Sequence, residues 1–123
     1  MPQYLISYDL KSSDPSPHKP FLDAAEKEDL LYVYKASTLN RLPNTTVWGI
    51  FADKDAARAA FDRALSAAGR KLGRAIVLEK RIITRLSDLY VRSDVSKAPV
   101  RQWLGTSDLE TCRKHQLNDP DFS

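Results

Sequence analysis

The sequence contains a single cysteine, Cys112, among its 123 residues, so it forms no internal disulfide. It has no run of about 18 apolar residues and therefore no membrane span, and its first residues lack the basic and then apolar pattern of a signal peptide. Its two histidines, His18 and His115, stand at no metal-ligand spacing from each other or from Cys112. These absences predict a cytoplasmic protein with surface histidines and an unreactive thiol.

Positive charge is modest in total but concentrated in the middle of the chain. The net charge is +3, yet residues 52–92 carry ten basic and five acidic side chains. Within this block, Arg70, Lys71 and Arg74 form a basic turn, where a polyanion such as RNA or DNA would bind. The alternative is that these charges belong to a solvated helix face and an ordinary turn.

Hydrophobic periodicity predicts an α+β fold. Apolar alternation and β-branched or aromatic content indicate strands, and stripes at helical spacing indicate helices. The expected order is strand 3–10, helix 20–29, strand 30–36, loop 37–44, strand 45–51, helix 53–68 with Gly69 as C-terminal cap, and strand 74–82. The alternative end of this last strand is Leu86. This order is that of a ferredoxin-like βαββαβ fold, a four-stranded antiparallel sheet with two helices on one face.

The remaining chain has a different character. We expect a ferredoxin-like domain over residues 1–88 and a partly helical C-terminal extension over 89–123. Ser107 and Glu110 have capping-box spacing and predict a last helix that runs to about Leu117, whereas residues 118–123 are expected to fray.

Two helices cover only one face of the expected sheet. The opposite face would expose apolar side chains, and large exposed apolar patches usually mark interfaces. A homodimer that packs two such faces together is one solution. The alternative is that the C-terminal extension folds back over the face, with Trp103 as its plug.

Asp9 ends the first strand and is the candidate metal ligand and catalytic residue. Two copies of Asp9 near a dimer axis would suit one Mg²⁺ or Mn²⁺, which commonly binds one or two carboxylates plus water and phosphate oxygens. Ser7 and Tyr8 flank the carboxylate and are candidate supporting residues. The alternative is that Asp9 caps a turn, as aspartates after strands often do.

Two segments carry a resemblance to a known family. Tyr4-Leu-Ile-Ser-Tyr-Asp-Leu10 resembles the first strand of the CRISPR-associated endoribonuclease and spacer-integration partner family, with its SinR-like and virulence-associated protein D relatives. Thr45-Thr-Val-Trp48 resembles the third strand of SinR-like proteins. The resemblance implies a ferredoxin-like homodimer with Asp9 near its axis as a divalent-metal ligand. Some members of the family are structural and hold DNA without cutting it.

Three functions therefore remain open from the sequence. The first is a metal-dependent endonuclease that uses Asp9 from both subunits and the basic turn to position phosphate. The second is a non-catalytic dimeric scaffold that binds nucleic acid or a protein partner. The third is a small regulatory or ligand-binding dimer in which Asp9 only caps a turn.

Overall fold

The computed structural model describes residues 1–123 and has a mixed α+β fold with three α-helices and two three-stranded antiparallel sheets. The first sheet has the order β4-β1-β5 and consists of β1 (Gln3–Leu10), β4 (Thr46–Ile50) and β5 (Leu78–Arg85). The second has the order β2-β3-β6 and consists of β2 (Val33–Lys35), β3 (Leu39–Arg41) and β6 (Ser96–Lys97). The helices are α1 (His18–Lys27), α2 (Lys54–Leu72) and α3 (Asp108–Asn118), with 3₁₀ helices η1 (Arg101–Trp103) and η2 (Pro120–Phe122).

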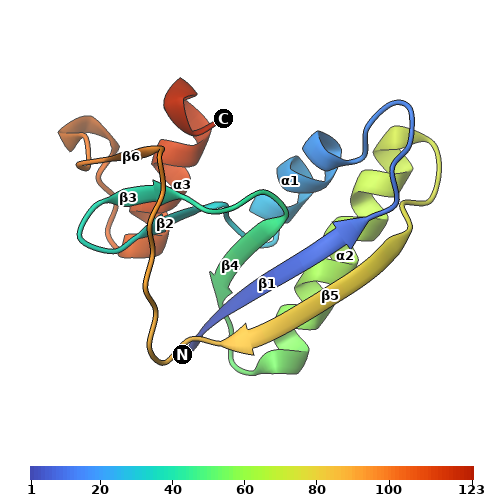
Figure 1. Cartoon of the computed structure of the whole chain (residues 1–123), viewed down its shortest axis with the longest axis horizontal. Coiled ribbons are helices and arrows are strands. Elements are labelled where there is room, and N and C mark those ends of the chain that lie inside the picture. Colours follow the sequence, from blue (N-terminus) through green and yellow to red (C-terminus); the bar gives the residue numbers. More distant parts are fainter.

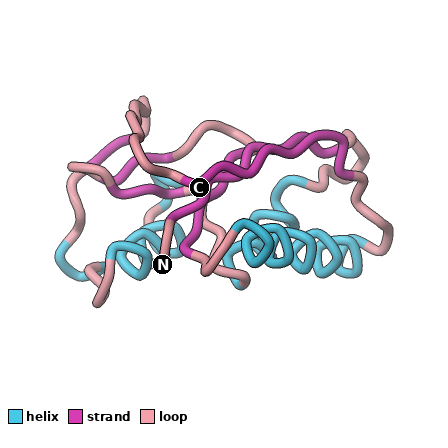
Figure 2. The backbone as a smooth tube through the Cα atoms, turned by 90° about the horizontal axis from the view of Figure 1, so that it is seen from below, coloured by secondary structure: helices cyan, strands magenta, loops and turns pink.

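The strands lie in one layer and the α-helices in another (Figures 1 and 2). The strand β1 is the centre of the first sheet, between β4 and β5. No helix has the length and apolar character needed to cross a membrane. The helix layer leaves the other face of the first sheet without a helical cover, which is the face on which Asp9 lies.

The first core fills the space between the first sheet and helices α1 and α2. Alternation along β1 points Tyr4, Ile6 and Tyr8 toward the helices, where all three are buried. The rings of Tyr8, Phe21 and Phe61 pack together with centroid separations of 4.8–5.3 Å. The facing stripe of α2 is alanine-rich, which lets this helix pack closely against the sheet.

The helix α2 begins where the sequence predicted but extends further. The Asp53 carboxylate accepts a hydrogen bond from the Ala56 N–H at 2.8 Å, as expected of an N-cap. The predicted end at Gly69 is wrong, because the helix continues to Leu72 and ends at Gly73, whose φ of 84° favours glycine. Gly69 instead permits close packing, since a Cβ there would lie 3.0 Å from the Arg74 carbonyl oxygen.

The four-stranded sheet predicted from the sequence is not found. Leu31 forms an isolated bridge with Trp48, and their backbone groups exchange two hydrogen bonds of 2.8 Å. The indole N–H of Trp48 then donates to the Val33 carbonyl at 2.6 Å. Residues 33–35 pair instead with β3, which lies in the stretch predicted to be a loop. The predicted strand 30–36 is therefore divided between a bridge to the first sheet and an edge of the second.

The C-terminal segment builds a second core with residues 31–48. Leu31, Val33, Trp48, Cys112 and Phe122 are buried together there. The Ser107 hydroxyl accepts a hydrogen bond from the Glu110 N–H at 3.2 Å, so the predicted cap and helix α3 are confirmed. Residues 118–123, which we expected to fray, include η2 with the fully buried Phe122.

Trp103 does not plug the first sheet. Its ring packs edge-to-face on His115 at a centroid separation of 5.3 Å, and it remains partly exposed. The C-terminal segment therefore covers the second core, while Ser7, Asp9 and Ile82 of the first sheet stay exposed.

Candidate functional site

Asp9 lies on the helix-free face of the first sheet, near the end of β1. Its side chain is exposed, as is that of Ser7 two residues earlier. In the register of β1 with β5, Asp9 is opposite Lys80 and Ser7 is opposite Ile82. Asp9 is the only acidic residue among the paired positions of β1, β4 and β5. The neighbour that the fold gives to Asp9 is thus a cation instead of a second carboxylate.

Tyr8 lies on the opposite face from Asp9. It is buried between Phe21 and Phe61, and burial raises the pKa of its phenol, although the nearby Arg41 guanidinium opposes the shift. A side chain that packs into the helix layer does not orient a carboxylate on the other side of the sheet. Of the two predicted supporting residues, only Ser7 shares a face with Asp9.

A divalent metal ion does not fit the residues that one chain offers at this site. No group of three or more histidine, cysteine, aspartate or glutamate side chains is close enough to hold a metal ion. Mg²⁺ tolerates one or two protein carboxylates, with water and substrate oxygens as its other ligands. Lys80, however, lies directly across from Asp9 and disfavours a second positive charge there. A metal at Asp9 would depend on a carboxylate from another molecule.

The predicted basic residues Arg70, Lys71 and Arg74 lie at one end of the molecule together with Lys11, and we call these four residues the basic end. Arg70 and Lys71 lie in the last turn of α2 and are exposed, and neither forms an ion pair. Arg70 and Arg74 line a groove of about 630 Å³ between the end of α2 and residues 73–76. The charge cluster expected from the sequence is therefore brought to one exposed surface.

The loop after β1 lies against this turn. The Lys11 N–H donates to the Val77 carbonyl at 2.9 Å, and the Arg74 guanidinium donates to the Pro15 carbonyl at 3.0 Å. Figure 1 shows the blue loop and the yellow-green turn side by side. Lys11 thereby joins the basic end, although the sequence analysis did not select it. The available signal was the position of Lys11 directly after the central strand. An antiparallel neighbour of that strand begins beside its end, so the basic turn before β5 had to lie close to Lys11.

His115 and Cys112 are buried on α3, which corrects the expected surface position of His115. The His115 Nε2 accepts a hydrogen bond from the Val100 N–H at 2.9 Å, and its Nδ1 lies 2.9 Å from the Thr111 carbonyl oxygen. Both ring nitrogens are thus occupied by backbone groups. Burial raises the pKa of the Cys112 thiol to about 12, so this thiol is not a nucleophile at neutral pH.

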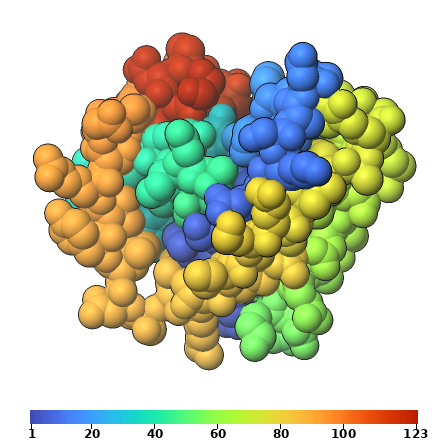
Figure 3. Space-filling model, turned by 45° about the vertical axis from the view of Figure 1, so that its right-hand side comes forward, coloured from blue at the N-terminus to red at the C-terminus, as the bar shows by residue number.

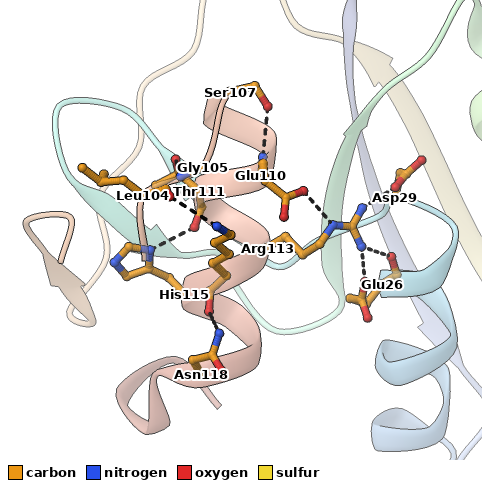
Figure 4. Close-up of polar contacts among 11 residues, drawn as sticks. Glu26, Asp29, Leu104, Gly105, Ser107, Glu110, Thr111, Arg113, His115 and Asn118 are labelled. Carbon is orange, nitrogen blue, oxygen red and sulfur yellow. Dashed lines mark hydrogen bonds and ion pairs between the residues drawn. The ribbon is translucent and has the colours of Figure 1, made fainter. Parts of the chain in front are cut away.

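Arg113 joins the two halves of the molecule, as Figure 4 shows. Its guanidinium forms ion pairs with Glu26 and Asp29 at the end of α1 and donates to the Glu26 carbonyl at 2.8 Å. Its Nε also lies 3.6 Å from a Glu110 carboxylate oxygen. Sequence reasoning missed this contact. The signal in the sequence was the charged run from Glu26 to Asp29. The packing of a short helix with one apolar stripe does not explain this run, so its carboxylates could have indicated a basic partner elsewhere in the chain.

Comparisons with family models, with curated proteins and with solved structures give no match to this chain. The function is therefore argued from the geometry of the molecule.

Proposed function

We propose that this protein binds the phosphate backbone of a nucleic acid, RNA or DNA, at its basic end, and that it does so without cutting the strand. The single observation that supports binding is the exposed and unpaired set of Arg70, Lys71 and Lys11 beside the groove that Arg70 and Arg74 line. Arginine and lysine side chains that lack an acidic partner are free to replace the counterions of a polyanion.

We favour binding without cleavage over cleavage because there is no second acidic group near Asp9. Hydrolysis of a phosphodiester by a bound metal ion needs ligands that hold the ion against the substrate. Asp9 supplies one carboxylate, with the exposed Ser7 hydroxyl beside it on the same face. The metal-dependent endonuclease suggested by the sequence stays as the second candidate, supported by the exposure of Asp9 on a face open to a long ligand.

Salt titration of binding to single-stranded RNA and to duplex DNA tests the proposal. Three contacts to phosphate predict a slope of log K against log salt of roughly −2 to −3. The double variant Arg70→Glu/Lys71→Glu removes two of these contacts and should abolish most of the binding. Lys54→Glu/Arg58→Glu is the control matched in charge, because both residues are exposed near the other end of the same helix and Arg58 already pairs with Asp55 at 3.3 Å.

The outcomes separate the functions. Equal loss in the two double variants would mean that only net charge matters. Absence of any polyanion affinity at moderate salt would leave a small-ligand or regulatory role. Cleavage of either nucleic acid with Mg²⁺ that disappears in Asp9→Asn would replace the proposal by the endonuclease. Cleavage that persists in Asp9→Asn would point to a contaminating nuclease.

A further inference from the structure

The outer strand β5 has one edge that pairs with nothing in the chain. It forms a ladder only with β1, and none of the backbone hydrogen bonds outside regular elements involves residues 79–85. The Leu86 N–H donates to the Gln3 carbonyl, so the backbone groups of Leu86 face β1. Because this direction alternates along a strand, residues 80, 82 and 84 also direct their backbone groups toward β1. Residues 81, 83 and 85 therefore direct their N–H and C=O groups to the free edge, and Glu79 lies just before this regular stretch, where the register of β5 shifts between the partners of Asp9 and Leu10. A strand of eight residues with an open edge is a template for another strand.

The most exposed apolar side chain of the first sheet lies at the middle of this strand. Ile82 is 69% exposed and points to the helix-free face, directly opposite Ser7. Figure 3 shows the yellow atoms of β5 at the surface on this side of the molecule. The charged residues Glu79 and Arg85 lie three positions before and after Ile82. This placement gives the edge a symmetry about Ile82 that another copy of the same strand would match.

We infer that two copies of this chain pair edge to edge along β5, antiparallel, with the two-fold axis at Ile82. In this register Glu79 lies opposite the partner subunit's Arg85, and Arg85 lies opposite the partner subunit's Glu79. Arg81 lies opposite the partner subunit's Ile83, and this pair exchanges backbone hydrogen bonds through the groups that the single chain leaves free. The two Ile82 side chains meet at the axis. The result is one continuous six-stranded sheet.

The two adjacent registers, with axes at Arg81 and Ile83, are disfavoured by charge. Two residues that lie opposite each other in an antiparallel pair both direct their backbone N–H and C=O groups toward the partner strand, or both direct them away from it. The two-fold axis of such a dimer must therefore pass beside a residue of β5, and the alternative registers have their axes at the other residues of this strand. An axis at Arg81 places two arginines opposite each other, and an axis at Ile83 places Arg81 opposite the partner subunit's Arg85 twice. An axis at Lys80 places two lysines opposite each other beside two Glu79–Arg81 pairs. An axis at Thr84 brings no like charges together, but it forms none of the Glu79–Arg85 pairs. Like charges directly opposite destabilise a pair of strands, whereas the Ile82 axis creates two pairs of opposite charge.

This arrangement differs from a dimer that packs two sheet faces together. The two copies of β1 are separated by three strand spacings, about 14 Å, so the two Asp9 carboxylates are too far apart to share one metal ion. Ser7 is separated from its copy by the same distance, whereas the two Ile82 Cα atoms would be about 4.5 Å apart. The inference does not depend on nucleic-acid binding at the basic end, and either can fail alone.

Cysteine cross-linking in the full chain distinguishes the two geometries. The buried Cys112 is not expected to react, so the wild-type chain is the background control. In Ile82→Cys, the two Cα atoms lie within the range that a disulfide spans, and mild oxidation should give a covalent dimer of twice the 13.9 kDa chain. In Ser7→Cys, an exposed position on the same face, the separation exceeds what a disulfide spans, and the chain should stay single.

Cross-linking at Ile82→Cys together with its absence at Ser7→Cys supports the inference. Linking at Ser7→Cys alone would indicate the face-to-face dimer, equal linking at both positions would indicate random collision, and linking at neither would indicate a single chain; each of these results overturns the inference.

Charge reversal then tests the register by sedimentation. Glu79→Arg and Arg85→Glu should each raise the dimer dissociation constant about tenfold, because each change replaces two pairs of opposite charge by two like pairs. The double variant Glu79→Arg/Arg85→Glu restores the pairs and should return the constant to the wild-type value. Failure of the double variant to recover while both single variants stay folded would overturn the Ile82 axis.

Discussion

The core under the first sheet is built from thirteen buried residues, all of them hydrophobic, whereas the core around α3 combines seven hydrophobic residues with buried polar groups. Those polar groups are bound to specific partners. His115 is held by the Val100 and Thr111 backbones, and the Gln116 side chain accepts a hydrogen bond from the Tyr32 N–H at 2.8 Å. Hydrophobic burial has no direction, while a buried polar group without its partner is costly.

Substitutions in the two cores should therefore have different effects on stability. The first core draws its stability from burial and should lose it in proportion to the apolar volume removed. The second core depends on a set of hydrogen bonds and ion pairs between segments far apart in the chain, so it should be able to open while the first stays folded. The following predictions test this difference.

The largest effect is expected in the first core. Phe61 is fully buried between Tyr8 and Phe21, so Phe61→Ala should lower the free energy of unfolding by about 3–5 kcal/mol. Urea unfolding followed by circular dichroism measures the change. Leu117→Ala on α3 is the control, since a side chain that is 60% exposed should change stability by less than about 0.5 kcal/mol. A similar loss in both variants would contradict the packing described for the first core.

A smaller effect is expected where the two halves meet. Arg113→Leu removes the ion pairs to Glu26 and Asp29 and leaves the acidic end of α1 without its cation, at a cost of about 2 kcal/mol. The exposed pair of Arg58 and Asp55 is the control, and Arg58→Ala should cost less than about 1 kcal/mol.

The rate at which Cys112 is alkylated in the native protein reports how often the second core opens, because this thiol is fully buried. Arg113→Leu should raise that rate much more than Arg58→Ala does. Equal rates in the two variants would show that Arg113 does not hold α3 against the first half of the molecule.

Local patterns predicted the elements that depend on neighbours in sequence. The start of α2 at Asp53 and the start of α3 at Ser107 follow from caps within three residues, and the strand with Asp9 follows from alternation along a short segment. The end of α2 was missed because Gly69 is required for contact with Arg74 and not for a turn. The packing of that turn cannot be read from the helix alone.

Interactions between distant segments account for the other errors. The strand predicted at 30–36 leaves the first sheet where the Trp48 indole binds Val33, fifteen residues earlier in the chain. His115 looked like a surface residue because its partner, the Val100 N–H, belongs to an irregular segment without a sequence signature. The basic residues of the candidate site were predicted, but the cation opposite Asp9 was not, because it follows from the register of β5.

The smallest expected effect is a dependence of the second core on pH. Asp119 is buried, and burial alone would raise the pKa of its carboxyl, but the ion pair with Lys97 and the hydrogen bond from the Asp121 N–H outweigh burial and lower it. The Lys97 amine lies 2.5 Å from Asp119 Oδ2, and this ion pair raises the pKa of Lys97. Both shifts mean that the folded protein favours the charged pair over the neutral one.

The directions of these two pKa shifts define the pH range over which the ion pair of Lys97 and Asp119 stabilises the fold. A lowered carboxyl pKa stabilises the fold above the ordinary aspartate value near 4, and this contribution is lost as the pH falls through the pKa of the folded state. A raised amine pKa stabilises the fold below the ordinary lysine value near 10.5, and this contribution is lost as the pH rises beyond it. Alkylation by a thiol reagent that reacts in acid should therefore detect more frequent opening around Cys112 below about pH 4. In Asp119→Asn the opening should be frequent at every pH and nearly independent of it, while a wild-type acid dependence that survives this change would assign the effect to other groups.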